Sequence, residues 1–183
     1  MQPRVILNSR HFKLTIERLC YQLIEDHGDF SNTALIGVQP RGVHLSKRIV
    51  QRLQAINPAL QLQYGVLDVT FYRDDFRQKE KPMTPEETRI DFSLENQRVI
   101  LVDDVLYTGR TIRSAMDALL DYGRPDRIEL LALVDRRFSR DVPIKADYVG
   151  KTVDAIVSER VKVEWEEVNG EDNIWILTEN DNA

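Results

Sequence analysis

The chain has 183 residues, of which 42% are hydrophobic and 30% charged, and its formal net charge is −5. This length allows one substantial core and is short for two, so we expect a single domain over residues 1–183. The sequence has no run apolar enough for a transmembrane helix, no signal-peptide pattern, and one cysteine, Cys20, which excludes an internal disulfide framework and favours a cytoplasmic protein.

The first part of the chain predicts helices alternating with strands. Apolar residues recur at helical spacing over residues 8–27, with Asn8 as a candidate N-cap. Residues 33–38 form an uninterrupted apolar run, which is typical of a buried strand. A second helix is expected over residues 42–55, and a strand over residues 63–72, which are rich in β-branched and aromatic residues.

Residues 73–91 differ from the rest of the chain because they are highly charged, contain two prolines and show no sustained apolar period. One interpretation is a solvated or partly disordered loop. The other is a flexible lid over a site, because long irregular loops inside compact domains are uncommon and often cover sites. An extended hairpin with a disordered tip would satisfy both interpretations.

The second part of the chain continues the alternation. We expect a buried strand over residues 98–103, a helix over residues 109–122, a strand over residues 127–135 and a C-terminal hairpin over residues 161–177. Strands that alternate with helices predict an α/β fold with a mostly parallel central sheet. Ligands bind at the carboxyl ends of such strands, so the turns after residues 38, 103 and 135 are expected at one edge.

Two adjacent acids, Asp103 and Asp104, follow the central apolar strand. An ionised carboxylate has two acceptor oxygens and can therefore take both hydroxyl protons of a vicinal diol such as a ribose. Consecutive strand residues point to opposite faces, so both acids can reach one site only if the chain turns out of the sheet there. This pair is a candidate sugar-binding site.

Thr108-Gly109-Arg110-Thr111 comes next, at the expected start of a helix. Its free amide groups and helix dipole form an anion site, and the hydroxyl groups can add donors. Acids for a diol followed by a phosphate cradle have the reach of ribose 5-phosphate. The alternatives are ordinary solvated residues, the metal-binding strand of a P-loop ATPase and a dinucleotide fold. The last two fail because their glycine motifs are absent.

The run Val102–Thr111 resembles the phosphoribosyl-pyrophosphate signature of type I phosphoribosyltransferases. The longer stretch Val99–Leu119 is similar to one family among them, the bifunctional pyrimidine-operon attenuation proteins and uracil phosphoribosyltransferases. Further matching blocks are Tyr72–Asp75, Gly123–Pro125, Leu133–Arg136 and Pro143–Lys151. The resemblance implies the type I phosphoribosyltransferase fold, with a small C-terminal β hood and a mobile loop.

The resemblance also implies an activity: uracil and phosphoribosyl pyrophosphate would give UMP and pyrophosphate, with Mg²⁺ as cofactor. Asp103 and Asp104 would hold the ribose hydroxyls and the metal, and Arg41 would bind pyrophosphate; these three are the candidate catalytic residues. On its pattern alone, Arg41 would be an ordinary surface residue at a helix start. The expected binding residues for the substrates and product are Pro40, Arg41, Gly42, Arg73, Asp103, Asp104, Val105, Leu106, Tyr107, Thr108, Gly109, Arg110, Thr111, Val134, Asp135 and Arg136.

A second implied activity is UMP-responsive binding of pyrimidine-operon leader RNA, which promotes transcription termination. The candidate basic face consists of Arg18, Arg137, Arg140, Lys145 and Lys151. The alternative is a solvated charged loop. Arg137-Phe138 stands where the family commonly has Gly-His, and Glu17 and Tyr21 also depart from the family, which weakens the case for RNA.

Three hypotheses remain open from the sequence. The first is an active uracil phosphoribosyltransferase with or without regulation, the second an RNA-binding regulator with vestigial catalysis, and the third a transferase for another nucleobase. The intact run over residues 102–111 favours activity. The family also suggests a homodimer or a higher homo-oligomer.

Overall fold

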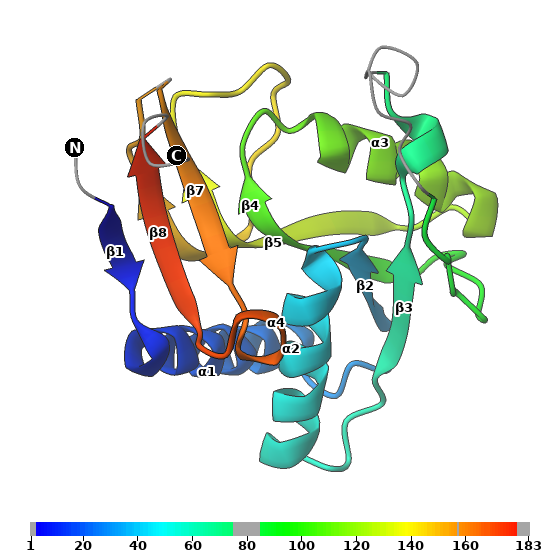
Figure 1. Ribbon diagram of the computed structural model, residues 1–183. Helices are drawn as coiled ribbons and strands as arrows, with labels where there is room; N and C mark the ends of the chain where they lie inside the picture. Colours follow the sequence, from blue (N-terminus) through cyan, green and yellow to red (C-terminus); the bar gives the residue numbers. More distant parts are fainter. Residues whose placement is uncertain (1–2, 75–84, 157, 179–183) are drawn as a thin grey trace.

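The computed structural model describes residues 3–74, 85–156 and 158–178. Its centre is a five-stranded sheet with strand order β3-β2-β4-β5-β6, in which all neighbouring strands are parallel (Figure 1). The predicted α/β class with a parallel sheet is confirmed. The strands are β2 (Thr33–Val38), β3 (Gln63–Leu67), β4 (Arg98–Leu106), β5 (Arg127–Arg136) and β6 (Tyr148–Val153).

Helices cover both faces of this sheet. α1 (Ser9–His27) and α2 (Gly42–Ile56) pack in one hydrophobic cluster, on one face of the sheet. α3 (Arg110–Leu119) packs in the other cluster, against the side chains that project from the opposite face. α1 begins as predicted, because the Asn8 side chain accepts a hydrogen bond from the His11 amide at 3.1 Å. Cys20 is fully buried within α1.

A second, three-stranded antiparallel sheet, which we call the hood, lies beside the first helix (Figure 1). It consists of β1 (Arg4–Leu7), β7 (Glu159–Glu164) and β8 (Asn173–Thr178), with the short helix α4 (Glu166–Asn169) between β7 and β8. The predicted C-terminal hairpin is confirmed. β1 was not predicted from the sequence, and it joins the hood by pairing with β8.

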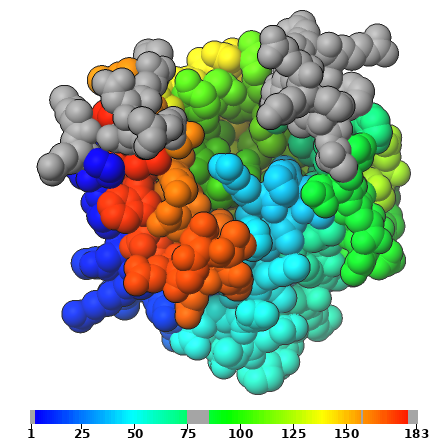
Figure 2. All heavy atoms as spheres, in the orientation of Figure 1, coloured from blue at the N-terminus to red at the C-terminus, as the bar shows by residue number. Residues whose placement is uncertain are grey.

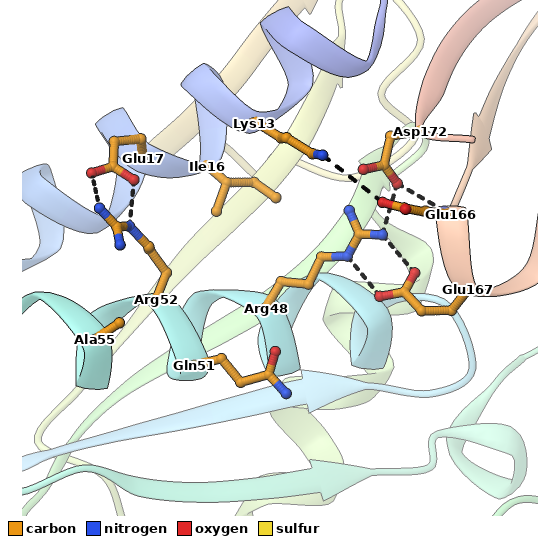
Figure 3. A pocket seen from close by; sticks show the side chains of 10 residues that line it. All are labelled: Lys13, Ile16, Glu17, Arg48, Gln51, Arg52, Ala55, Glu166, Glu167 and Asp172. Carbon is orange, nitrogen blue, oxygen red and sulfur yellow. Dashed lines mark hydrogen bonds and ion pairs between the residues drawn. The ribbon is translucent and has the colours of Figure 1, made fainter. Parts of the chain in front are cut away.

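Figure 3 shows how the hood is fixed to α2, around a cavity of about 420 Å³. Arg48 on α2 donates hydrogen bonds to both carboxylate oxygens of Glu167 and to Oδ1 of Asp172. Asp172 is 1% exposed and also accepts from the Glu166 amide at 2.8 Å. The Arg48 guanidinium carbon lies 5.1 Å from the Trp165 ring centroid. A partly buried charged cluster therefore joins the hood to α2.

Two expectations need correction, and one strand was missed. The strand predicted over residues 63–72 ends at Leu67, and Thr70–Tyr72 form a 3₁₀ helix (η1), because the Asp68 carboxylate accepts from the Thr70 amide and hydroxyl. The helix predicted to reach residue 122 ends at Leu119 and continues as a 3₁₀ turn (η2, Leu120–Tyr122). β6 was not predicted as a strand at all.

Most of the charged segment after η1 lies outside the described residues, since residues 75–84 are not among them. The lid interpretation and the hairpin interpretation therefore stay predictions. At the far end of the segment, Arg89 exchanges two backbone hydrogen bonds with Val66 of β3, at 2.8 and 3.0 Å. In the described part of the chain, no helix is long and apolar enough to span a bilayer.

Candidate active site

The central strands of the parallel sheet differ in length at their carboxyl ends. The pairing of β2 with β4 ends at Val102, whereas β4 stays paired with β5 up to Leu106. Residues 103–106 therefore have a neighbouring strand on one side only. A cavity of about 350 Å³ lies at this end of β4. Asp103 and Asp104 both line it. The expectation that the strand ends at Asp103 was wrong, because β5 provides a partner that extends it.

Arg41 reaches the same cavity from the start of α2. Gly42 packs so closely on β4 that a Cβ atom there would lie 2.3 Å from a main-chain carbonyl oxygen and 3.0 Å from the Asp103 Cα. Only glycine allows this approach. The Gln39–Pro40 peptide bond is cis. Burial raises the pKa of Asp103 and of Asp104, and the positive charge of Arg41 offsets part of this rise because it favours the ionised carboxylates.

The surrounding protein groups only partly compensate for the burial of these two carboxyl groups. Burial raises the pKa of both carboxyl groups above the ordinary value, and at Asp103 the charge of Asp104 raises it further. Oδ1 of Asp103 accepts from the Asp104 amide at 2.9 Å, and Oδ1 of Asp104 accepts from the Val105 amide at 2.7 Å. Oδ2 of Asp104 is buried and has no hydrogen-bond partner among the described residues. This arrangement suits hydroxyl donors or a cation.

The donor set also fits Mg²⁺ in one particular way. No group of three His, Cys, Asp or Glu side chains among the described residues could form a complete metal site. Mg²⁺ is commonly held by one or two carboxylates together with substrate phosphates and water, and not by an all-protein cage. Asp103 and Asp104 both line the cavity, and the unpartnered oxygen of Asp104 leaves this pair with unused acceptor capacity, which matches that mode.

The β4–α3 loop (residues 107–109) depends on Gly109. The φ angle of Gly109 is +85°, and a Cβ atom there would lie 2.8 Å from Val142 and 3.3 Å from Ile144, so both the backbone conformation and the packing require glycine. α3 begins directly after it, where the first amide groups have no intrahelical acceptor and favour an anion. Thr111 in this first turn lines the cavity, and its hydroxyl accepts from Arg73 at 3.0 Å.

The carboxyl end of β5 forms another wall. Arg136, its last residue, is 4% exposed and donates to the Ile156 carbonyl oxygen at 2.7 Å. Its guanidinium lies over the ring of Tyr107. Both residues line the cavity, and β7 of the hood adds Arg160 and Val161. In the space-filling view, green residues of the β4–α3 region lie between the orange hood and the cyan start of α2 (Figure 2).

The structure brings together many of the residues predicted from the sequence. The predicted residues that line the cavity are Pro40, Arg41, Arg73, Asp103, Asp104, Val105, Tyr107, Thr111 and Arg136. The predicted residues that do not line it are Gly42, Leu106, Thr108, Gly109, Arg110, Val134 and Asp135. Among these, Val134 is fully buried, and Arg110 forms exposed ion pairs with Asp74 and Asp141.

Sequence reasoning missed three lining residues, Gln39, Arg160 and Val161. Gln39 directly precedes the predicted Pro40, so a wider reading of that turn would have included it. No local signal marks Arg160 and Val161, because they reach the cavity only through the packing of the hood.

The predicted basic residues have different surroundings. Arg18 donates to the carbonyl oxygens of residues 149 and 150, next to Lys151 on β6. Arg137 forms an exposed ion pair with Asp154 at 2.7 Å. Lys145 is exposed. Arg140 points inward and contacts main-chain oxygens of the site, and only 22% of its side chain is exposed. The candidates other than Arg140 therefore lie at the surface on and around β6.

The fold and this cavity define a class of protein, the phosphoribosyltransferases. Residues 5–167 match the family described as "Phosphoribosyl transferase domain". Solved structures of hypoxanthine phosphoribosyltransferases have the same fold. The one from Staphylococcus aureus has a TM-score of 0.73 at 20% identity and covers 98% of this chain and 94% of that chain. The one from Trypanosoma cruzi has a TM-score of 0.72 at 17% identity, with 96% of each chain covered.

Curated relatives narrow the class. The chain is 41% identical to the "Bifunctional protein PyrR" of Elusimicrobium minutum, over 97% of this chain and 98% of the relative. It is 42% identical to the protein of the same name from Deinococcus radiodurans, over 96% and 95%. The chain belongs to the PyrR family of phosphoribosyltransferases, which confirms the resemblance seen in the sequence.

Proposed function

We propose that the protein is a uracil phosphoribosyltransferase and also a UMP-responsive RNA-binding attenuator of pyrimidine-operon transcription. The observation that supports catalysis most directly is the meeting of Asp103, Asp104 and Arg41 in one cavity with the first turn of α3. An RNA-binding regulator with vestigial catalysis would not need to keep two adjacent acids there, one of which has a buried oxygen without a partner. Both functions would place the protein in the cytoplasm, where pyrimidine nucleotides are made and used.

The proposed reaction transfers a ribose 5-phosphate group. The bond between C1′ and the pyrophosphate oxygen breaks, a bond from C1′ to N1 of uracil forms, and the N1 proton is released. The acids hold the two ribose hydroxyls as hydrogen-bond acceptors. The amide groups at the start of α3 and the Thr111 hydroxyl bind the 5′-phosphate, which fixes the sugar between two anchors.

Charge placement does most of the catalytic work in this proposal. Arg41 neutralises the departing pyrophosphate, and the nearby carboxylates favour the positive charge that develops on the sugar. Asp103 and Asp104 would hold Mg²⁺, which would supply further neutralisation of the pyrophosphate charge. Arg73, at the start of the charged segment, and the hood restrict the access of water to the activated sugar. The uracil ring lies near Arg136.

The test is direct. We incubate the protein with phosphoribosyl pyrophosphate, Mg²⁺ and each nucleobase separately, and measure the nucleotide formed. UMP from uracil supports the proposal, and chelation of Mg²⁺ should abolish its formation. IMP, GMP or AMP in place of UMP would redirect the proposal to a purine transferase. If no base gives a nucleotide, the catalytic proposal is rejected, and the RNA-binding regulator with vestigial catalysis is supported instead.

A matched pair of variants assigns the chemistry to the cavity. Asp104→Asn keeps the size of the side chain but removes the charge, so kcat/KM should fall by about 10²-fold or more. Asp117→Asn makes the same change on the exposed face of α3 and should keep the wild-type value. Equal rates in the two variants would remove Asp104 from the site.

The second activity rests on the name of the relatives and on the basic residues around β6, in particular Arg18, Arg137 and Lys151. Binding of pyrimidine-operon leader RNA is measured with and without UMP at several salt concentrations. We expect tighter binding with UMP, a falling affinity with rising salt, and a weaker salt dependence in Lys151→Gln. UMP-independent binding, or none, would reject the regulatory half and leave the transferase intact. The oligomeric state, which we expect to be a homodimer or higher, is measured in the same samples.

A further inference from the structure

Arg140 does not line the cavity, but it contacts several of the segments that do. All three guanidinium nitrogens of Arg140 donate hydrogen bonds to the surrounding chain. Nε donates to the Ile144 carbonyl oxygen at 3.0 Å. Nη1 shares its two hydrogens among the carbonyl oxygens of Leu106 at 3.3 Å, Arg136 at 2.8 Å and Tyr107. Nη2 bonds to the Asp135 carboxylate.

These acceptors come from segments that are far apart in the sequence. Leu106 and Tyr107 lie at the end of β4 and in the β4–α3 loop, whereas Asp135 and Arg136 end β5. Main-chain oxygens that leave a sheet lose their strand partners and need other donors. A planar guanidinium has five donors in a fixed geometry and can satisfy more acceptors at once than an ammonium group, which has three.

The residues that follow Arg140 also contact the β4–α3 loop. The amides of Asp141 and Val142 donate to the Thr108 carbonyl oxygen at 3.0 and 3.3 Å. Val142 and Ile144 occupy the space beside Gly109. Segment 140–144 is therefore a brace behind the β4–α3 loop, and Arg140 ties that brace to β5.

We propose that Arg140 is a positioning residue of the transferase site, which holds the β4–α3 loop in register with the end of β5, and is not an RNA contact. This inference rests on the proposed function. It replaces the expectation from the sequence that Arg140 belongs to the basic face. The loop carries the start of α3, so a loosened brace would mainly displace the amide groups that bind the 5′-phosphate.

The experiment compares Arg140→Gln, Arg140→Lys and Arg127→Gln by steady-state kinetics with uracil and phosphoribosyl pyrophosphate. Arg127 is a matched control, because it lies on the same strand as Arg136 but at the opposite end, is 59% exposed and pairs with Glu129, which keeps Arg98 as a partner. We expect Arg140→Gln to raise KM for phosphoribosyl pyrophosphate about tenfold or more, and KM for uracil by less than about threefold. Arg140→Lys should lie between Arg140→Gln and the wild type, and Arg127→Gln should match the wild type.

Three results would overturn the proposal. The first is wild-type KM and kcat in Arg140→Gln, with or without weaker binding of leader RNA. The second is an equal rise of both KM values, since that indicates a general disturbance. The third is a lower kcat with unchanged KM values, which indicates that part of the variant protein is unfolded. An inactive wild-type protein would instead reject the proposed function, so the two failures are distinguishable.

Discussion

The guanidinium carbon of Arg136 lies 4.3 Å from the centroid of the Tyr107 ring, in cation–π contact. Arg136 ends β5, and Tyr107 follows β4, so the contact joins two walls of the cavity. Tyr107 is 42% exposed, whereas Arg136 is buried, so the ring covers a charge that the interior would otherwise penalise. The pair therefore shapes the region where we place the uracil ring.

Removal of the ring should affect uracil more than the sugar. We predict that Tyr107→Leu raises KM for uracil by roughly three- to tenfold, because a cation–π contact contributes about 0.5–2 kcal/mol. Tyr107→Phe keeps the aromatic face and should stay near the wild type. Steady-state kinetics with each substrate varied would check both variants. A larger change in KM for phosphoribosyl pyrophosphate than for uracil would contradict the assigned place of the base.

Arg41 should matter chiefly in the transition state. We predict that Arg41→Ala lowers kcat/KM for phosphoribosyl pyrophosphate by about 10²-fold, because the charge on the leaving pyrophosphate would lose its partner. Arg10→Ala, which removes an exposed arginine near the start of α1, serves as the control. Wild-type kinetics in Arg41→Ala would sink the assignment of this residue.

The cluster between the hood and α2 should dominate the stability of the hood. Arg48→Met keeps the apolar stem but leaves Asp172, which is 1% exposed, without its charged partner. We predict that the free energy of unfolding falls by about 3–5 kcal/mol. Arg89→Gln breaks an exposed pair with Glu87 and should leave the free energy of unfolding close to the wild-type value. Urea denaturation of both variants measures this contrast, and equal losses would refute it.

A buried histidine should make stability depend on pH. Burial, aided by the charge of Arg98, lowers the pKa of His27 to about 4 from its usual 6.5. Its ring nitrogens lie 3.1 Å from the Thr33 hydroxyl and 3.0 Å from the Tyr148 hydroxyl. Nε2 also lies 3.4 Å from a carboxylate oxygen of Glu129, but Arg98 and Arg127 pair with that carboxylate, so burial of the imidazole remains the larger effect. Between these pKa values the unfolded chain binds more protons than the folded one, so the free energy of unfolding falls as pH drops from about 6.5 towards 4.

His27→Gln provides the comparison, because an amide can donate to one hydroxyl and accept from the other without titrating. We predict a flatter dependence on pH in the variant over this window, measured by urea denaturation at several pH values. Parallel curves for the wild type and the variant would show that His27 is not the group responsible.

Much of the candidate site was predictable because it is local in the sequence. Asp103, Asp104 and Thr111 lie within nine residues of one another on a strand, a loop and a helix start, and each of these elements has its own sequence signal. The alternation of strands and helices likewise fixed the parallel sheet and put the turns after β2, β4 and β5 at one edge.

Other features depended on partners that lie far away in the chain. β4 runs past Asp103 to Leu106 because β5 pairs with it that far. Arg160 and Val161 line the cavity only because the hood packs beside it, and Arg140 faces inward only because the end of β5 and the β4–α3 loop meet there. The sequence by itself determined the groups available for binding a sugar phosphate, since short-range pattern and residue chemistry specify them. The tertiary structure decided which groups share the cavity, since main-chain groups find their partners, and charges their surroundings, only after distant segments have packed.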